Sequence, residues 1–287
     1  MNETLTRIRP DAQALREVAD RIRGHIVDMC GSDEGGHLGG SLSVVDILTV
    51  LYFQVLRTSP EEADHRDRDI FVLSKGHGAL ALYATLAERG FLPTDELASF
   101  GAAGSRLAGH PVPGIPGVEM PTGSLGHGLA LGLGFALAAR LADSSRRSFV
   151  LTGDGELQEG SCWEAASCAA AQRADRLTAI IDVNGLQLGG KTSDIGPPGA
   201  VADRWRAFGW SVRECDGHDQ AALQAALAEV PWQPGRPSAL VAHTEKGHGI
   251  GFMASNVASH YATLSERQHT RARAALGAFV RRTAGAS

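Results

Sequence analysis

Apolar residues recur along the chain with two periods, and these periods separate helices from strands. From Ala12 to Met29 they return every three or four positions, which predicts a helix with one buried face. Short segments rich in β-branched or aromatic residues predict buried strands at Asp69–Leu73, Ser148–Thr152, Leu177–Asp182, Ser238–His243 and, more weakly, Trp210–Cys215. Further helices are predicted at Ala79–Arg89, Gly126–Leu141, Trp163–Gln172 and Gln220–Glu229.

The order of these elements predicts the fold class. Strands that alternate with helices are typical of an α/β fold whose parallel sheet is covered by helices on both faces. The Pro/Gly-rich stretches at 109–123 and 195–199 are interpreted as ordered loops, because hydrophobic segments continue on either side. We therefore expect one domain over residues 1–274, followed by a C-terminal tail at 275–287.

Composition narrows the class of protein only slightly. With 43% hydrophobic and 21% charged residues, the chain falls in the soluble globular range. A net charge of -5 without a basic stripe argues against nucleic-acid binding. No apolar run approaches the ~20 residues that a membrane-crossing helix needs. Neither a signal peptide nor a disulfide framework is indicated, so we expect a cytoplasmic protein without a membrane partner.

Polar residues and glycines follow each of the four stronger strands. Ligands of open parallel sheets bind beyond the carboxyl ends of the strands, so these residues are candidates for a binding site. Asp154 and Asn184 are separated by about one βαβ unit, roughly 30 residues, which places both at the same edge. Lys75 and Lys246 add two cations there. This set suits a diphosphate with Mg²⁺, which prefers a few protein oxygens and fills its remaining positions with phosphate and water.

The residues at this edge also carry a resemblance to a known family. Gly153-Asp-Gly155 followed by Asn184 is similar to the signature of thiamine-diphosphate enzymes. More narrowly, the chain resembles transketolase from about Val18 to Glu266. The motifs that carry this likeness are Gly36–Ser41, Leu73–His77, Gly109–Pro111, Thr122–Gly126, Gly153–Gly160, Trp163–Ala165, Ile181–Asn184 and Lys246–Gly249, with His260 beyond them.

The resemblance implies a fold, cofactors and roles for particular residues. The fold would be the diphosphate-binding domain of thiamine-diphosphate enzymes, and Mg²⁺, or Ca²⁺, would be held by Asp154, Asn184 and the backbone carbonyl of Leu186. Residues implied to contact thiamine diphosphate are His77, Gly123, Ser124, Leu125, Asp154, Gly155, Glu156, Asn184, Leu186, Lys246 and His260. Histidines implied to act on the donor sugar are His37, His110 and His260, and Glu159 would lie at a subunit interface.

The same resemblance implies a partner. In transketolases the glutamate that activates the cofactor, the pyrimidine pocket and most sugar-phosphate-binding arginines belong to a later domain, and this chain ends before such a domain would begin. We therefore expect a separate C-terminal, pyrimidine-binding transketolase subunit, with both chains assembled as an α2β2 heterotetramer. The complete enzyme would transfer a two-carbon ketol unit from a ketose to an aldose, with sugar phosphates as substrates.

Three alternatives remain open from the sequence. The first is the α subunit of a 2-oxo acid dehydrogenase, which shares the Gly-Asp-Gly and Asn element. The second is a noncatalytic assembly protein of the same fold. The third is a P-loop NTPase, because Gly185–Thr192 fits the pattern G-x-x-x-x-G-K-[ST]; the prolines and glycines of 193–199 disfavour the helix that a P-loop must open. Remaining histidines such as His218 are interpreted as ordinary hydrogen-bonded side chains.

Overall fold

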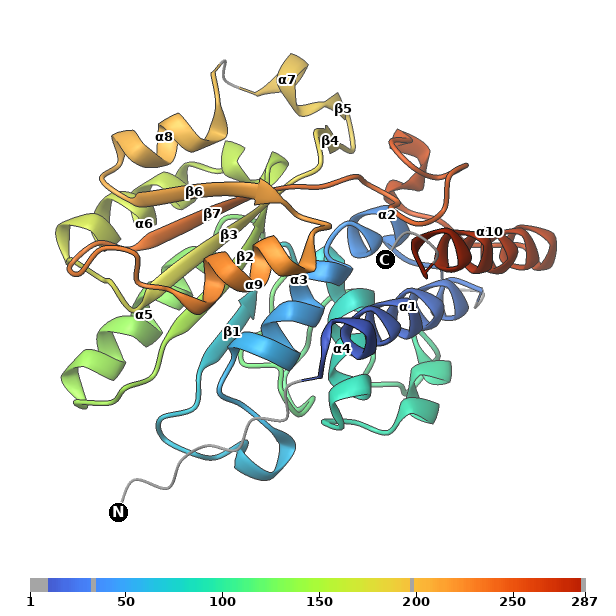
Figure 1. The fold of residues 1–287 in the computed structure, drawn as a ribbon, viewed down its shortest axis with the longest axis horizontal. Helices are drawn as coiled ribbons and strands as arrows, with labels where there is room; N and C mark the ends of the chain where they lie inside the picture. Colours follow the sequence, from blue (N-terminus) through green and yellow to red (C-terminus); the bar gives the residue numbers. More distant parts are fainter. Residues whose placement is uncertain (1–9, 32–34, 197–198, 285–287) are drawn as a thin grey trace.

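The computed structural model describes residues 10–31, 35–196 and 199–284. Five parallel strands form a sheet in the order β1-β2-β3-β7-β6 (Figure 1). These strands are β1 (Ile70–Leu73), β2 (Ser148–Gly153), β3 (Leu177–Val183), β6 (Ser211–Asp216) and β7 (Ser238–His243). A small antiparallel hairpin pairs β4 (Leu186–Gln187) with β5 (Gly190–Lys191). The predicted α/β class with a parallel sheet is confirmed.

Helices cover both faces of this sheet and enclose two hydrophobic cores. Neighbouring residues of a strand point to opposite faces, so Phe71 and Leu73 of β1 join one core while Ile70 and Val72 join the other. The first core includes side chains of α1, α3, α4 and α9, and the second those of α5, α6 and α8. The helices are α1 (Ala12–Met29), α2 (Leu38–Leu42), α3 (Val45–Val50), α4 (Ala79–Arg89), α5 (Gly128–Leu141), α6 (Gly160–Ala171), α7 (Thr192–Ile195), α8 (Val201–Ala207), α9 (Gln220–Ala228) and α10 (Glu266–Ala284).

Single helical turns connect several of these elements and complete the backbone. They are η1 (Leu51–Val55), η2 (Pro60–Glu62), η3 (Gly76–Gly78), η4 (Thr94–Ser99), η5 (Gly155–Gln158) and η6 (Val257–His260). Two of them, η3 and η5, begin within three residues of the ends of β1 and β2, so the chain turns sharply at the carboxyl edge of the sheet. This edge is the region in which the sequence places a ligand.

The predicted helices differ from the observed ones mainly at their starts. The helices α1 and α4 have the predicted bounds, whereas α5 begins at Gly128 rather than Gly126. Gly126 has a φ of 82°, a left-handed conformation that cannot begin a right-handed helix. Helix α6 begins at Gly160, three residues before the predicted Trp163, because the preceding Glu159 is extended and serves as its N-cap.

The C-terminal region is helical across the predicted domain boundary. Helix α10 runs without interruption through Ala274, the position at which the sequence places the end of the domain. Ala272 and Leu276 are buried on either side of that position, and α10 lies beside α1 (Figure 1). Among the described residues, no helix has both the length and the apolar content that crossing a bilayer requires.

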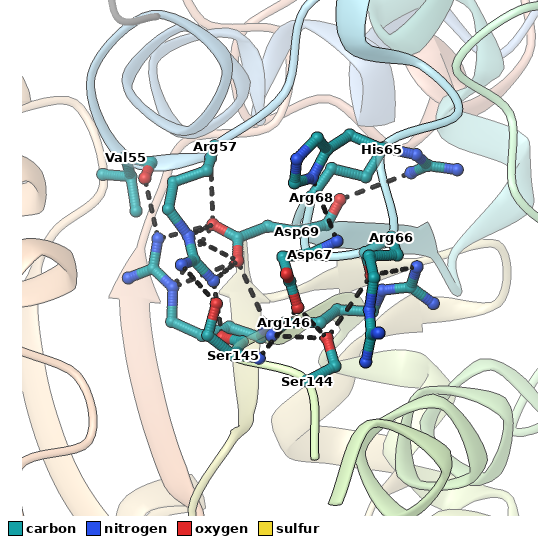
Figure 2. A network of polar contacts seen from close by, with 11 residues as sticks. Val55, Arg57, His65, Arg66, Asp67, Arg68, Asp69, Ser144, Ser145 and Arg146 are labelled. Atoms are coloured by element: carbon teal, nitrogen blue, oxygen red, sulfur yellow. Dashed lines mark hydrogen bonds and ion pairs between the residues drawn. The ribbon is translucent and has the colours of Figure 1, made fainter. Parts of the chain in front are cut away.

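A buried carboxylate fastens the amino edge of the sheet. Asp69, directly before β1, pairs with Arg57 at 2.7 Å and with Arg147, directly before β2, at 2.6 Å. It also accepts the backbone N–H groups of both arginines, at 2.9 and 3.0 Å. Figure 2 shows this network together with Asp67, which accepts the hydroxyl of Ser144 at 2.6 Å. The starts of β1 and β2 are thus fixed to each other by charge-assisted bonds.

We predict that Asp69→Asn lowers the free energy of unfolding by about 3–5 kcal/mol, because it leaves two arginines without their buried counter-ion. Burial alone would raise the pKa of Asp69, but Arg147 and Arg57 outweigh it and lower this pKa below its ordinary value of 3.8. The stabilisation is therefore complete above about pH 3.8 and is lost as the pH falls through the depressed pKa. Urea unfolding at several pH values measures this loss of stability, with the exposed Asp64→Asn variant as control. An equal loss of stability in both variants would contradict the prediction.

Candidate functional site

A cavity of about 420 Å³ opens at the carboxyl edge of the sheet. Its lining comes from the segments that follow β1, β2, β3 and β7, joined by residues near α2 and by two loops. Of the residues singled out in the sequence, the lining includes His37, Lys75, His77, His110, Gly123, Leu125, Asp154, Gly155, Glu156, Glu159, Asn184, Leu186, Lys246 and His260. Ser124, by contrast, is exposed and is not part of the lining.

Beneath the cavity lies an ion pair that the sequence does not reveal. The Nζ atom of Lys75 is 2.6 Å from Oδ2 of Asp182, and the two residues are 1% and 0% exposed. Lys75 also donates to the carbonyl of Gly40 at 2.7 Å. Lys75 therefore reaches the cavity as a neutralised cation, and not as the free one expected from the sequence.

Asp182 also accepts hydrogen bonds from several other side chains. Its carboxylate accepts the hydroxyl of Ser43 at 2.8 Å, the side-chain amide of Asn184 at 2.9 Å and the hydroxyl of Thr244 through a short bond. Burial alone would raise the pKa of Asp182, but Lys75 and these hydroxyls outweigh it and lower that pKa. Asp182 is thus ionised at neutral pH and joins β3 to the segments after β1 and β7.

Asp154 sits directly after β2 with part of its acceptor capacity unused. Its carboxylate accepts the N–H of Gly155 at 2.9 Å, the N–H of Gly185 at 2.8 Å and the hydroxyl of Thr192 at 3.0 Å. A carboxylate has about four acceptor positions, so one remains. Burial, and then the charge of Asp182, raise the pKa of Asp154. A cation at this carboxylate would relieve both effects.

Asn184 is held in a defined orientation at the same edge. Its Nδ2 donates to Asp182, and its Oδ1 accepts the N–H of Leu186 at 3.1 Å, which assigns the two amide atoms. An amide oxygen has two lone pairs, so Oδ1 can accept one more ligand. The backbone carbonyl of Leu186 lies 3.4 Å from Nζ of Lys246. Carboxylate, amide and carbonyl oxygens with free lone pairs suit Mg²⁺ or Ca²⁺.

Imidazole rings line the opposite part of the cavity. The ring centroid of His37 lies 5.4 Å from that of His77, 5.6 Å from that of His110 and 5.3 Å from that of His260. Burial, followed by nearby cationic groups, lowers the pKa of His37 and of His260 to about 4 and lowers that of His77 further; burial alone lowers that of His110. All four rings are therefore neutral at pH 7, and each can both donate and accept hydrogen bonds.

Two polar groups in this cluster are suited to binding a ligand. The Nδ1 atom of His37 is buried and has no hydrogen-bond partner among the described residues. Such atoms are rare in folded proteins, and a ligand hydroxyl or phosphate would satisfy it. Lys246 is 2% exposed, and its Nζ lies 2.9 Å from Nδ1 of His260. Burial and the charge of Lys75 lower the pKa of Lys246 to about 8, so an anion beside it would be stabilising.

Glycines bring the backbone close to the cavity at two points. A Cβ on Gly76 would come within 2.7 Å of the backbone nitrogen of Gly123. Gly123 itself has a φ of 144°, and a Cβ there would lie 3.1 Å from the ring of His110. Larger side chains at either position would push the two loops apart.

Glu156 lines the cavity, but its carboxylate oxygens accept hydrogen bonds from other groups of the protein. It accepts the N–H of Gly126 at 2.9 Å, the N–H of Gly153 at 3.1 Å and the hydroxyl of Ser74. Burial raises the pKa of Glu156. This carboxylate therefore holds together the loops that precede α5 and follow β1 and β2. Glu159 is exposed at the rim.

The hairpin geometry excludes the P-loop alternative. Residues 186–191 form the strands β4 and β5, and the helix that follows has only the four residues Thr192–Ile195. Lys191 is exposed on this hairpin and does not line the cavity. Thr192, the other residue of that pattern, instead donates its hydroxyl to Asp154.

The sequence missed the buried residues that support the site. Asp182 is a single acidic residue within the apolar strand Leu177–Val183, and a charge in such a strand indicates a buried partner. Ser43 and Thr244 carry no comparable signal, because hydroxyls are common on surfaces. His127, to which the sequence assigned no role, places Nδ1 within 3.2 Å of the carbonyl of Ser124 and 3.1 Å of that of Leu125. It therefore closes the turn before α5.

The fold and the cavity together define an α/β protein that binds a ligand at the carboxyl edge of a parallel sheet. Comparisons with known proteins identify the family. Residues 14–282 match the model of the transketolase, thiamine diphosphate binding domain. Because this match covers most of the chain, the chain belongs to the transketolase family.

Individual relatives agree with this family. An apulose-4-phosphate transketolase subunit of Actinobacillus succinogenes is 46% identical over 86% of this chain and 90% of the relative. The 6-deoxy-6-sulfo-D-fructose transketolase subunit SqwG of Clostridium sp. is 38% identical over 88% and 92%. The solved transketolase of Leishmania mexicana is 33% identical with a TM-score of 0.85, over 92% of this chain but only 41% of that longer chain.

We predict that Lys75→Met lowers the free energy of unfolding by about 3–5 kcal/mol, because Asp182 would lose its buried counter-ion. The matched control is Lys191→Met on the exposed hairpin, for which a change within about 0.5 kcal/mol is expected. Urea unfolding of both variants measures the difference. Equal stability of the Lys75 variant and the wild type would show that the pair does not anchor the site.

Proposed function

We propose that this chain is the cofactor-binding subunit of a two-component, thiamine-diphosphate-dependent transketolase. The assembled enzyme transfers a two-carbon ketol unit from a ketose to an aldose. The single observation that supports this most strongly is the set of oxygens with spare acceptor positions on Asp154, Asn184 and Leu186 beside the neutral histidines. Relatives that share about nine tenths of their own length with this chain are named as transketolase subunits. The α subunit of a 2-oxo acid dehydrogenase has no comparable support.

In this proposal the oxygens of Asp154, Asn184 and Leu186 hold Mg²⁺, or Ca²⁺, and the metal holds the diphosphate. Lys246 and the histidines beside it offer donors to the remaining phosphate oxygens, and Gly123 and Gly155 allow close approach of the backbone. When bound, thiamine diphosphate supplies an electron sink for cleavage of a carbon–carbon bond. The residues of this chain bind and orient the cofactor.

The sugar would meet the histidine cluster. His37, His110 and His260 are neutral at pH 7, so they can donate to sugar hydroxyls, accept from them, or take up a proton at a free ring nitrogen. The names of these two relatives differ in the sugar, but both sugars carry an anionic group, a phosphate in one and a sulfo group in the other. We therefore propose a ketose with an anionic terminus as donor, and the partner as the main source of groups that bind this anion.

The partner is proposed to be a C-terminal, pyrimidine-binding transketolase subunit in an α2β2 heterotetramer. Exposed apolar side chains near the cavity support a docking face: Leu188 on the β4–β5 hairpin is 71% exposed and Ile195 is 47% exposed. Glu159, exposed at the rim, belongs to this proposed interface. The cytoplasmic location expected from the sequence stays a prediction.

We predict that ketol transfer requires both subunits. The isolated chain should give no turnover with a ketose phosphate and ribose 5-phosphate, because the partner is proposed to supply the remaining catalytic groups. Adding the partner with thiamine diphosphate and Mg²⁺ should restore it, as followed by chromatography of the sugar products. Turnover by this chain alone at the rate of the complex would refute the two-component proposal.

We predict that Asp154→Asn weakens Mg²⁺-dependent binding of thiamine diphosphate by at least about 100-fold, because it removes the only charge among the three proposed metal ligands. Asparagine keeps an acceptor for the N–H of Gly185, whereas Asp154→Ala would also release the loop that contains Thr192. Calorimetry on the reconstituted complex measures the affinity, with the exposed Asp194→Asn of α7 as control. Unchanged affinity in the Asp154 variant would place the metal elsewhere.

A further inference from the structure

His218 connects three elements that lie far apart in the sequence. It occupies the loop between β6 and α9, and its side chain reaches Asp46 of α3 and the segment after β7. We infer that His218 is a positioning residue that sets the place of Lys246 in the cavity. This gives a specific role to a histidine that the sequence interprets as an ordinary hydrogen-bonded side chain. The effect that we expect on cofactor affinity rests on the proposed function.

Both ring nitrogens of His218 are engaged, and together they determine its tautomer. The backbone N–H of Glu245 donates to Nε2 at 2.9 Å, and Nδ1 lies 3.0 Å from Oδ2 of Asp46. A backbone amide can only donate, so Nε2 carries no proton. The neutral ring therefore carries its proton on Nδ1 and donates it to Asp46. This arrangement fixes the orientation of the ring.

Asp46, which binds Nδ1 of His218, is itself held by several contacts. Asp46 is 4% exposed, forms a short ion pair with Arg23 and accepts the side-chain amide of Gln220 at 2.9 Å. The His218 ring also stacks on His248, with centroids 3.5 Å apart and planes 10° apart. Burial alone would raise the pKa of Asp46, but Arg23 and His218 hold it well below its ordinary range, so the carboxylate remains ionised.

A metal site is the competing explanation for the cluster formed by Asp46, His218 and His248. Asp46, His218 and His248 each offer a ligand atom, and these atoms lie within 4.8 Å of one another. A metal on Nδ1 of His218 would move the ring proton to Nε2, where it would face the N–H of Glu245. Arg23 already provides the positive charge that Asp46 requires. The hydrogen bonds therefore favour a fixed connection between Asp46 and Glu245 over a metal centre.

The Glu245 end of the connection adjoins the cavity. Lys246, the next residue, is 2% exposed and directs Nζ toward His260 and the carbonyl of Leu186. Thr244 on one side binds Asp182, and Gly247 on the other donates its N–H to the carbonyl of Gly39 at 3.0 Å. Between these two anchors, the bond to His218 holds the Glu245 N–H, while the carbonyl of Lys246 accepts the N–H of Ser255 at 2.8 Å.

Two substitutions of His218 distinguish the effect of its bond to Glu245 from the effect of its bond to Asp46. The side-chain oxygen of glutamine can reach the position of Nε2, so His218→Gln keeps an acceptor for Glu245. The amide of asparagine reaches only the position of Nδ1, so His218→Asn keeps the donor to Asp46 and loses that acceptor. We expect the asparagine variant to bind thiamine diphosphate with Mg²⁺ roughly tenfold more weakly, the worth of one buried hydrogen bond, and the glutamine variant to stay within about twofold. Calorimetry on the reconstituted complex measures this.

Two readouts on this chain alone do not depend on the cofactor. Hydrogen exchange at the Glu245 amide should accelerate in His218→Asn and remain near wild type in His218→Gln. The rate of Lys246 acylation at one fixed pH, followed by mass spectrometry, should rise only in the asparagine variant, because the side chain of Lys246, a residue now 2% exposed, would be held less firmly in the cavity. His269→Gln, which removes a surface imidazole bonded to Asp28, is the matched control and should change neither.

The outcomes are distinguishable. Equal exchange and equal labelling in the two His218 variants, with both folded by circular dichroism, would overturn the inference. If the wild-type complex fails to bind thiamine diphosphate while exchange and labelling follow the expected pattern, the proposed function fails and the positioning of Lys246 by His218 stands.

Discussion

The ion pair between Lys75 and Asp182 is the interaction on which the site depends. It is buried beneath the cavity and joins the segment after β1 to β3, while Ser43 and Thr244 connect the same carboxylate to α2 and to the segment after β7. Two charges removed from water are costly unless every remaining donor and acceptor is satisfied, and here several further bonds surround them. The pair therefore sets where Asn184 and Lys246 enter the cavity.

The two edges of the sheet use aspartate for different purposes. At the amino edge Asp69 is enclosed by two arginines and their backbone N–H groups, so its bonds serve stability. At the carboxyl edge Asp154 has a raised pKa, no arginine partner among the described residues and an acceptor position left over. Spare acceptors near a second carboxylate are characteristic of sites completed by a cation, and the proposed metal site follows from that contrast.

The sequence predicted the sheet well because its central strands are buried on both faces and therefore form continuous apolar runs. It did not predict α10, whose arginines obscure a narrow apolar stripe that includes Ala272 and Leu276. The short helices α2 and α3 were also missed, since five or six residues give too little periodicity. Their stability comes from burial in the core.

Strand ends and glycines located the edge at which the cavity opens, and Asp154 and His77 both line this cavity, while their roles there stay predictions. The sequence did not show what the buried side chains do. Lys75 is paired with Asp182, Glu156 binds backbone groups, and His218 is oriented by partners more than 25 residues away in the sequence. Packing creates these contacts, so a local pattern such as the lone acidic Asp182 in an apolar strand can indicate a buried partner but cannot identify it.

We propose that the carboxyl edge of this sheet holds a metal ion against the diphosphate of the cofactor. A structure of the complex with thiamine diphosphate and Mg²⁺ would show whether this is so. We expect one ion coordinated at about 2.0–2.1 Å by oxygens of Asp154, Asn184 and Leu186. An ion bound without Asp154 and Asn184, or a diphosphate bound away from this cavity, would contradict it.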